Sequence, residues 1–530
     1  MFLAIQHTVS NGLHYIDILI VILSLTIILL IGYFYSKKQT STKYYFVAEG
    51  SMPSWAVGIS LLATIVSSVT FLAYPGSGYA GNWILLVQGI AIAIVLSVII
   101  WIIVPLYRNL IGISAYEYFE KRFGYFARIY SSAAFIMAYI SKMAAIFYLI
   151  GIAISSMVGI DALMIILILG VLVIILTLFG GIKAVIWLDV FQGFLLIIGG
   201  VVVFLILIFS IDGGLSTIFK IADEHGRVGF GPYNFDFIEL TFWVMLINGI
   251  FFAIQNFGTN QLIVQRFITA KSNKEAIKAS LMGILFCVPL WSLFMFIGTA
   301  LFVYYTLNPA LLPNNVPADG VFPVFIMNEL PVGVTGLIIA AMLATAFSSL
   351  DSELNSISAV LTEDYYARIK KNASDKNKLR FGKFAVMIVG CFTLLMATLY
   401  TIVGNEGALG VVFTLYAIFS GGIAGMFLLG LLTRKANKKG LYVGIVVTIL
   451  FTGYAVLTST SINDKLILDL GNWNFTHHKF MLGVYSHLII FVVGYFASLL
   501  FDHAPIDNDL TIYAWLRKKN RRKENQFRQN

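Results

Sequence analysis

The sequence has 530 residues, of which 59% are hydrophobic and 12% are charged, and its formal net charge is +9 at pH 7. Apolar runs of about 20 residues, the length that a helix needs to cross a bilayer, recur along the chain. This composition excludes a soluble globular domain and predicts an all-α polytopic membrane protein. The two cysteines, Cys287 and Cys391, fall inside apolar runs and support neither a disulfide framework nor a zinc site.

We expect about 13 transmembrane helices. The first apolar run, "YIDILIVILSLTIILLIGYFYS", has no basic flank and no small-residue cleavage site, so it is interpreted as a retained helix and not as a signal peptide. The predicted spans lie at roughly 14–33, 55–80, 83–107, 126–158, 161–179, 183–210, 240–265, 279–305, 332–362, 384–403, 408–432, 440–459 and 480–501.

The basic residues indicate an orientation. With the N-terminus outside, 30 of the 35 Lys and Arg residues fall on the inner side, including the runs at 367–383, 434–439 and 517–523. This asymmetry explains the net charge by topology and anionic lipid, without a nucleic-acid partner. We therefore expect a multi-pass protein of the cell (plasma or inner) membrane, with one transmembrane domain over 1–501 and a basic cytoplasmic tail over 502–530.

Four charged residues are predicted well inside the spans, away from the span ends. Lys142 is the only cation that the sequence places there, and the acids are Asp189, Asp351 and Glu353. Each such group costs several kcal/mol unless it faces a partner, an ion or a water-filled cavity. These residues are therefore the first candidates for function.

Two spans carry an unusual density of polar residues and helix breakers. The second contains "ATIVSSVTFLAYPGSG", and the seventh contains "INGIFFAIQNFGTNQ". A pair of interrupted spans in corresponding places predicts an inverted-repeat transporter, whose unwound backbone contacts ions and substrate near the midplane. The two five-helix repeats would cover about 55–210 and 240–432, with one extra N-terminal and two extra C-terminal helices. The alternative is that these small and hydroxyl residues only let helices pack closely.

The ninth span contains a ladder of oxygen atoms, in "ATAFSSLDSELNS". On a helix, Thr345, Ser348, Ser349 and Ser352 share one face, and Asp351 extends its flank. Hard cations prefer oxygen ligands, so this face is a candidate sodium site. The alternative is that the serines bond back to their own helix and the acids pair with lysines.

At these residues the chain resembles the solute:sodium symporter family, which includes sodium/sugar and bacterial sialic acid transporters with the fold of bacterial amino-acid symporters. The resemblance extends from "YYFVAEGSMPSWAVGISLLAT" through "LFGGIKAVIWLDVFQ" and "IVQRFITAKSNKEA" to "LLGLLTRKANKKGLYVGIV". It implies sodium as the coupling ion and no organic cofactor. The implied partners are a small solute, sodium ions and the lipid bilayer, with no nucleic acid.

The resemblance also implies two sodium sites. The conserved site takes backbone carbonyls from the second span and hydroxyls from the ninth, and the matching residues are Ala63, Val66, Thr345, Ser348 and Ser349. A second, deeper site of some members is matched by Asp189, Ser348, Asp351 and Ser352. Asp351 departs from the Ser or Thr of relatives. Its carboxylate could strengthen this site, hold a proton or bind a lysine.

The implied solute is a sugar or sugar acid, because the second span is most similar to that of sialic acid transporters. Their substrate arginine in the fourth span is replaced here by Lys142, which keeps the charge but loses the bidentate fork. Galactose carriers use a lysine and a polar residue where this chain has Cys287 and Gly89, which argues against their form of recognition. The substrate candidates are Ser67, Thr70, Gln88, Lys142, Gln255, Asn256 and Phe257.

These observations predict a Na⁺-coupled symporter and not an enzyme, since no histidine lies near the intramembrane acids and no cysteine cluster is present. A symporter for another solute, such as a monocarboxylate or polyol, and one driven by protons through Asp189 or Asp351 remain alternatives. A channel, a solute sensor and an uncoupled carrier are further ones.

Overall fold

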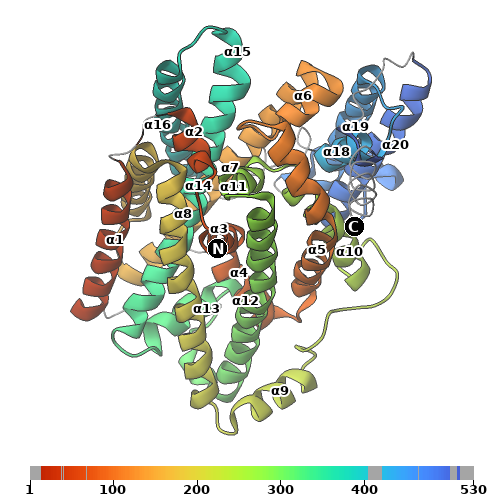
Figure 1. Cartoon of the computed structure of the whole chain (residues 1–530). Coiled ribbons are helices and arrows are strands. Elements are labelled where there is room, and N and C mark those ends of the chain that lie inside the picture. The colour runs from red at the N-terminus through yellow and green to blue at the C-terminus, as the bar shows by residue number, and fades with distance from the viewer. Residues whose placement is uncertain are drawn as a thin grey trace, which may run out of the picture.

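The computed structural model describes residues 13–36, 39, 41–66, 68–403, 421–462, 465–501 and 510–513. Within these ranges, ten helices are long and apolar enough to cross a membrane, and one bent pair of helices makes up to eleven spans (Figure 1). The ten are α1 (Tyr15–Ser36), α5 (Ile84–Leu110), α7 (Tyr125–Val158), α8 (Ala162–Ser210), α10 (Phe242–Thr259), α12 (Asn273–Leu307), α14 (Val334–Val360), α16 (Asp375–Val403), α19 (Lys438–Ser459) and α20 (Lys479–Leu499).

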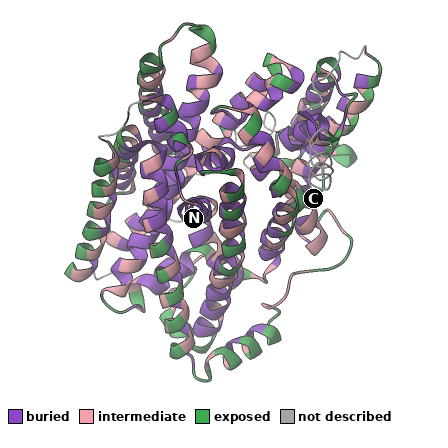
Figure 2. Ribbon diagram, viewed as in Figure 1, coloured by how far each residue is buried: buried purple, intermediate pink, exposed green. Residues whose placement is uncertain are grey.

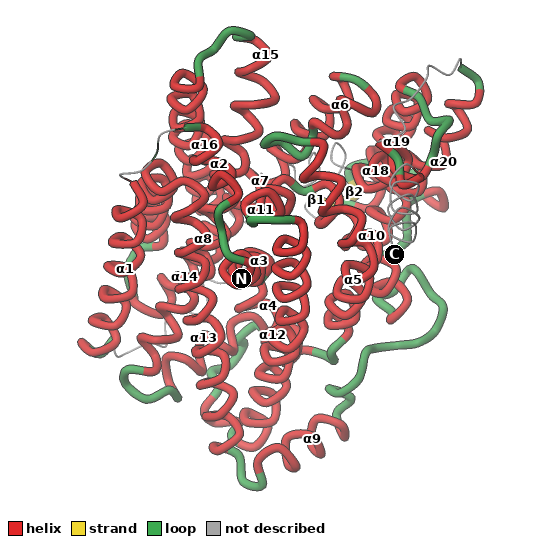
Figure 3. The backbone as a smooth tube through the Cα atoms, in the orientation of Figure 1, coloured by secondary structure: helices red, strands yellow, loops and turns green. Residues whose placement is uncertain are grey.

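Shorter elements connect or extend these helices. Figure 3 shows a long loop between α9 and α10, and Figure 1 places α9 at one end of the molecule and α6 and α15 toward the other. The shorter elements are α2 (Thr42–Val47), η2 (Ala48–Gly50), α3 (Ser54–Ile65), α4 (Ser68–Ala80), α6 (Glu117–Phe123), α9 (Gly214–Glu224), α11 (Gln261–Thr269), η3 (Pro309–Leu311), α13 (Ala318–Asn328), η4 (Leu361–Tyr366), α15 (Ala367–Ile369), α18 (Ile423–Leu432), η5 (Gly471–Trp473) and an antiparallel pair of strands, β1 (Ser461–Ile462) and β2 (Lys465–Leu466).

The second predicted span is broken, as the sequence indicated. Helix α3 ends at Ile65, Val66 is extended (φ −86°, ψ 91°), and α4 continues at an angle of 55° to α3. The break lies within the run of hydroxyl residues. Pro75 and the glycines beside it lie inside α4, so they do not cause the interruption.

The seventh predicted span is also broken. Helix α10 ends at Thr259, Asn260 is extended (φ −84°, ψ 120°), and α11 begins at Gln261. The side chain of Asn260 accepts a hydrogen bond from the Leu262 amide (3.0 Å), so the residue that interrupts one helix caps the next.

The predicted fifth and sixth spans form one continuous element, α8, with a kink and no loop between them. The kink lies at Gly181 (φ 59°, ψ −175°), a conformation that favours glycine. A Cβ atom at this position would lie 2.8 Å from the ring of Tyr45, so the close approach of α2 also requires glycine. Of the predicted span at 408–432, only the part from 421 on is described, with α18 at Ile423–Leu432. These two places account for the difference between the thirteen predicted spans and the eleven, with the bent pair counted as one, among the described residues.

Helix α14 lies at the centre of the molecule. Almost all of its residues are buried, and it contacts α1, α3, α7, α8, α11 and α16. Figure 2 shows this burial, with green exposed positions mostly on the outer helices. A helix that is buried all round needs apolar residues or fully paired polar ones, yet α14 carries two acids and five serines. Its polar residues are therefore the centre of the candidate site.

Candidate functional site

The buried carboxylate of Asp189, on α8, joins four helices. It accepts hydrogen bonds from Ser60 Oγ on α3 (2.5 Å), Ser348 Oγ on α14 (2.5 Å) and Arg266 Nη2 on α11 (2.9 Å). All four side chains are fully buried. Asp189 and Ser348, which the sequence assigned to one site, are thus brought into direct contact. Helix α3 ends at the break in the second span and α11 begins after the break in the seventh, so both interrupted spans meet at this carboxylate.

Arg266 is the functional residue that the sequence reasoning missed. It follows the predicted seventh span, which ends near residue 265, so the sequence places it on the inner side of the membrane, and the structure buries its side chain completely. Arg266 donates to Asp189, to Ser60 Oγ (2.9 Å) and to Ser352 Oγ (2.7 Å). The sequence feature that could have indicated its burial is the run "QLIVQRFIT", which continues past the predicted end of the seventh span and forms the buried helix α11.

The hydroxyls of the first predicted sodium site lie on one stretch of α14 and differ in their partners. Thr345 donates back to the Met342 carbonyl (2.8 Å), the self-bonding that the alternative interpretation expected. Ser348 donates to Asp189, whereas the buried Ser349 Oγ has no hydrogen-bond partner among the described residues. A buried hydroxyl without a partner costs about 1–3 kcal/mol, so Ser349 retains an oxygen that a cation could use.

The backbone half of that predicted site lies where α3 ends. Ala63 and Val66 are buried, and α3 contacts α14. Ala63 lies in the last turn of α3, where carbonyls generally lose their intrahelical donors. The arrangement brings carbonyl and hydroxyl oxygens from two distant segments to neighbouring helices, but the sodium site itself stays a prediction.

Asp351 differs from the other acids of the site. It is fully buried, and neither carboxylate oxygen has a hydrogen-bond partner among the described residues. Its charge interacts with those of Asp189 and Arg266. Ser352, the last member of the predicted second sodium site, accepts a hydrogen bond from Arg266 Nη2 (2.7 Å). The four predicted residues therefore lie in one cluster, but Arg266 lies among them.

Two adjoining cavities, of about 640 and 190 Å³, lie beside these helices. Both are lined by Ile65 at the end of α3 and by Asn260 between α10 and α11, so both helix breaks reach them. A cavity of a few hundred Å³ with a small number of polar groups is the usual form of a small-molecule site.

Six of the seven predicted substrate residues line these cavities. The smaller one is lined by Thr70, Gln88, Lys142, Asn256 and Phe257, and the larger one by Lys142, Gln255 and Asn256. Ser67 lies outside the described residues. The Gln88 amide already donates to Asn248 (2.7 Å), and Phe257 is only 2% exposed, which fits packing better than stacking on a solute.

Lys142, on α7, is the charged residue that both cavities share. Its Nζ lies 2.7 Å from Glu353 Oε1 on α14, and 5.3 Å from the ring centroid of Tyr139. The Lys142 side chain is 41% exposed, whereas that of Glu353 is fully buried. The cation that was expected to bind a substrate carboxylate therefore already has an anionic partner.

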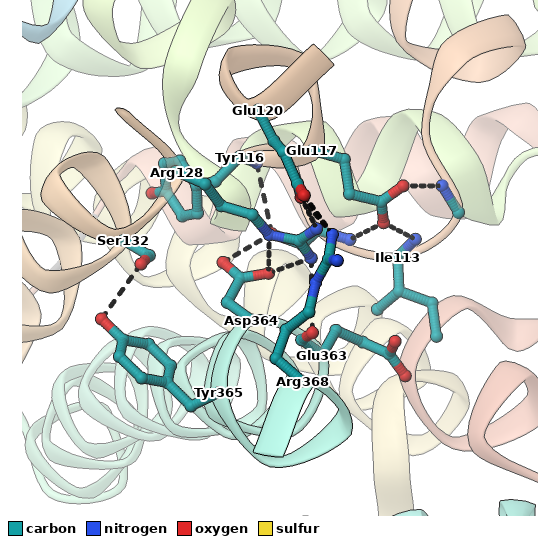
Figure 4. A network of polar contacts seen from close by, with 12 residues as sticks. Ile113, Tyr116, Glu117, Glu120, Arg128, Ser132, Glu363, Asp364, Tyr365 and Arg368 are labelled. Atoms are coloured by element: carbon teal, nitrogen blue, oxygen red, sulfur yellow. Dashed lines mark hydrogen bonds and ion pairs between the residues drawn. The ribbon is translucent and has the colours of Figure 1, made fainter. Parts of the chain in front are cut away.

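A second polar network ties the end of α14 to α6 and α7 (Figure 4). Arg128 on α7 bonds Asp364 on η4 (2.8 Å from Nε) and Glu120 on α6 (2.6 Å). Arg368 on α15 also bonds Glu120, and Ser114 Oγ donates to Asp364 (2.9 Å). The sequence reasoning assigned no role to these residues, because each is separated from its partners by a loop or by more than 200 positions.

Within the described part of the chain, no three His, Cys, Asp or Glu residues are grouped so as to hold a metal ion. The oxygens that these residues offer a cation are those of hydroxyls, carbonyls and at most two carboxylates, which suit hard ions such as sodium better than zinc or copper.

Comparison with known proteins gives the family. The Sodium:solute symporter family model matches residues 45–448. The sodium/sialic acid symporter NanT of Aliivibrio fischeri is 35% identical, over 90% of this chain and 91% of its own length, and the sodium/sialic acid symporter SiaT of Proteus mirabilis is 36% identical, over 91% and 94%.

The structural comparisons agree. A solved structure of a Na⁺-coupled sialic acid symporter, substrate-bound and outward-open, superposes with a TM-score of 0.85 at 32% identity and covers 93% of this chain and all of that one. Mhp1, a nucleobase-cation-symport-1 family transporter, superposes with a TM-score of 0.57 at 15% identity over 86% of this chain, which shows a shared fold. The chain belongs to the sodium:solute symporter family.

Proposed function

We propose that this protein is a Na⁺-coupled secondary active symporter that imports a small polar organic solute, a sugar or a sugar acid similar to sialic acid, and that it is not an enzyme. The observation that carries the proposal is the meeting of two broken helices with the buried oxygens of α14 beside a pair of cavities. Relatives that span nearly the whole chain and are named for sodium and sialic acid support the same function.

The proposed sodium sites follow from the oxygen atoms. The first comprises carbonyls of Ala63 and Val66 with the hydroxyls of Thr345, Ser348 and Ser349. Ser349 supports it most directly, since its oxygen is buried without a partner. Sodium held there would fix α3 against α14 and thereby order the break that borders the cavities.

The proposed second cation site is supported by a count of charges. Asp189 and Asp351 carry two negative charges when ionised, whereas Arg266 carries one positive charge, so these three residues have an excess of one negative charge. A buried excess charge is costly and attracts a cation or a proton. We assign this cation to Asp351 and Ser352 near Asp189 and Ser348. A proton on Asp351 is the second candidate, favoured by its unpartnered oxygens.

The proposed topology has thirteen spans, with α8 contributing two. The repeats cover about 55–210 and 240–432, the N-terminus lies outside, and the C-terminus lies in the cytoplasm. In this orientation the network of Arg128, Asp364 and Glu120 lies on the cytoplasmic side, where it would hold α6 and α7 against the end of α14. Release of these ion pairs would accompany opening to the cytoplasm. Each sodium ion that crosses a potential of 100 mV supplies about 2.3 kcal/mol.

Uptake of labelled N-acetylneuraminic acid into proteoliposomes tests the proposal. Inward gradients of Na⁺, K⁺ and H⁺ are imposed separately, and protein-free liposomes serve as the control. We expect saturable uptake above equilibrium only with the Na⁺ gradient. Uptake that follows the pH gradient alone would replace sodium by protons as the driving ion, and equal, non-accumulating uptake under all conditions would refute coupling.

A further inference from the structure

Glu353 is a buried acid that the proposed sodium and solute sites do not use. It lies on α14 and is fully buried, and its Oε1 lies 2.7 Å from Lys142 Nζ. Its Oε2 is buried without a hydrogen-bond partner among the described residues. The charge of Lys142 interacts with that of Glu353, whereas Arg266 pairs with Asp189, so the two ion pairs are separate.

The pair is asymmetric in its access to solute. Lys142 is 41% exposed and lines both cavities, whereas Glu353 lines neither and lies behind it. An ammonium group has three donors, so Lys142 can keep its bond to Glu353 and still donate to a solute. A solute at Lys142 therefore meets a cation whose charge is already offset by an anion one hydrogen bond away.

This arrangement has a consequence for selectivity. A cation without a partner in a site of low dielectric constant favours a carboxylate strongly over a neutral group. With Glu353 behind Lys142, a bound carboxylate gains the attraction of the ammonium but is repelled by the Glu353 carboxylate. The hydroxyls of a neutral solute still accept a hydrogen bond from the ammonium and suffer little of that repulsion.

We infer that Glu353 is a specificity-determining residue, which acts through Lys142 to reduce the preference of the solute site for carboxylated over neutral polyhydroxylated compounds. The inference rests on the proposed solute site. A site with this pair should accept a wider range of solutes, both acidic and neutral, than a site with the lysine alone. Glu353 is a positioning residue in this role, because it does not line the cavities.

The test compares N-acetylneuraminic acid with its methyl ester, which has the same hydroxyls and no charge. For each variant the measured quantity is the ratio of the constant for the ester to the constant for the acid. The constants are inhibition constants against labelled uptake, or dissociation constants from thermal shifts in NaCl. In Glu353→Gln we expect the acid to gain at least tenfold over the ester in this ratio, because the ammonium of Lys142 loses the negative charge that Glu353 supplies. Glu353→Met, which removes the buried polar atoms as well, carries the same expectation and serves as the second variant.

Glu329→Gln is the matched control, since Glu329 bonds Tyr304 (2.8 Å) and lines neither cavity; its ratio should equal that of the wild type. A purely structural ion pair would weaken acid and ester equally, so an unchanged ratio in Glu353→Gln, or a shift toward the ester, would overturn the inference. If the wild type binds neither compound, the proposed solute class is wrong. The ratio is then measured on whichever matched pair does bind, such as glucose and glucuronic acid, with the same two outcomes.

Discussion

Replacing Ser349 with alanine should separate sodium binding from folding. The Ser349 hydroxyl is buried on α14 without a hydrogen-bond partner among the described residues, so its removal breaks no bond within the protein. The free energy of unfolding without sodium should be unchanged or slightly higher, because a buried unpaired hydroxyl costs about 1–3 kcal/mol. With sodium, the variant lacks one oxygen ligand.

The expected loss of affinity follows from that ligand. A hydrogen-bond-like interaction of a neutral group with a charged one contributes about 1.5–3 kcal/mol, so its loss corresponds to a dissociation constant for sodium that is about 10- to 160-fold higher. At a sodium concentration 100 times the wild-type Kd, sodium stabilises the wild type by about 2.7 kcal/mol. A tenfold weaker variant would gain about 1.4 kcal/mol under the same conditions.

Melting curves of the purified protein, in increasing NaCl with choline chloride keeping the ionic strength constant, measure both quantities. Ser358→Ala is the matched control, because Ser358 lies on the same helix and donates to the Gly382 carbonyl (2.6 Å). We expect it to lower the melting temperature in both salts and leave the sodium dependence intact. A Ser349→Ala variant with wild-type sodium dependence, or one that melts lower in choline chloride alone, would refute the reasoning.

Three further predictions concern charged residues. Asp189→Asn should abolish transport or change the Hill slope for sodium, and a variant with the wild-type slope and rate would reduce Asp189 to a structural acid. Lys142→Ala should weaken binding of carboxylated solutes more than that of neutral sugars, and equal losses would remove its role in the solute site. Arg128→Met should lower stability by about 3–5 kcal/mol, because it leaves the buried charge of Asp364 without its ion-pair partner. Asp364→Asn in the same chain should restore part of the loss, and a melting temperature equal to that of the wild type would show that the network is not needed.

The sequence predicted the helices and both breaks, because apolar length and polar interruptions are local properties. It could not tell which residues make a break. In the second span, Pro75, Gly76 and Gly78 lie inside α4, where a Cβ atom on Gly78 would lie 2.3 Å from the Met295 carbonyl oxygen. These glycines serve close packing, and the hydroxyl residues before them lie at the break. The predicted interruption thus applies to the hydroxyl residues, and the alternative of close helix packing applies to the glycines of α4.

The partners of the buried charges could not be predicted from the sequence. Asp189 and Arg266 are 77 positions apart, and Arg266 lies on the short buried helix α11, which begins directly after the extended residue Asn260. Glu353 and Lys142 are separated by 211 positions, although both were predicted to lie within the spans. The contacts of such groups depend on how α7, α8, α11 and α14 pack together, a property of the whole fold.

The central claim is that sodium binds between α3 and α14 before any solute is present. Equilibrium binding of ²²Na⁺ to the purified protein in detergent, without solute, tests it most directly. We predict saturable binding that unlabelled NaCl displaces and that KCl and choline chloride do not. Binding that is absent, or that KCl displaces equally well, would contradict the claim.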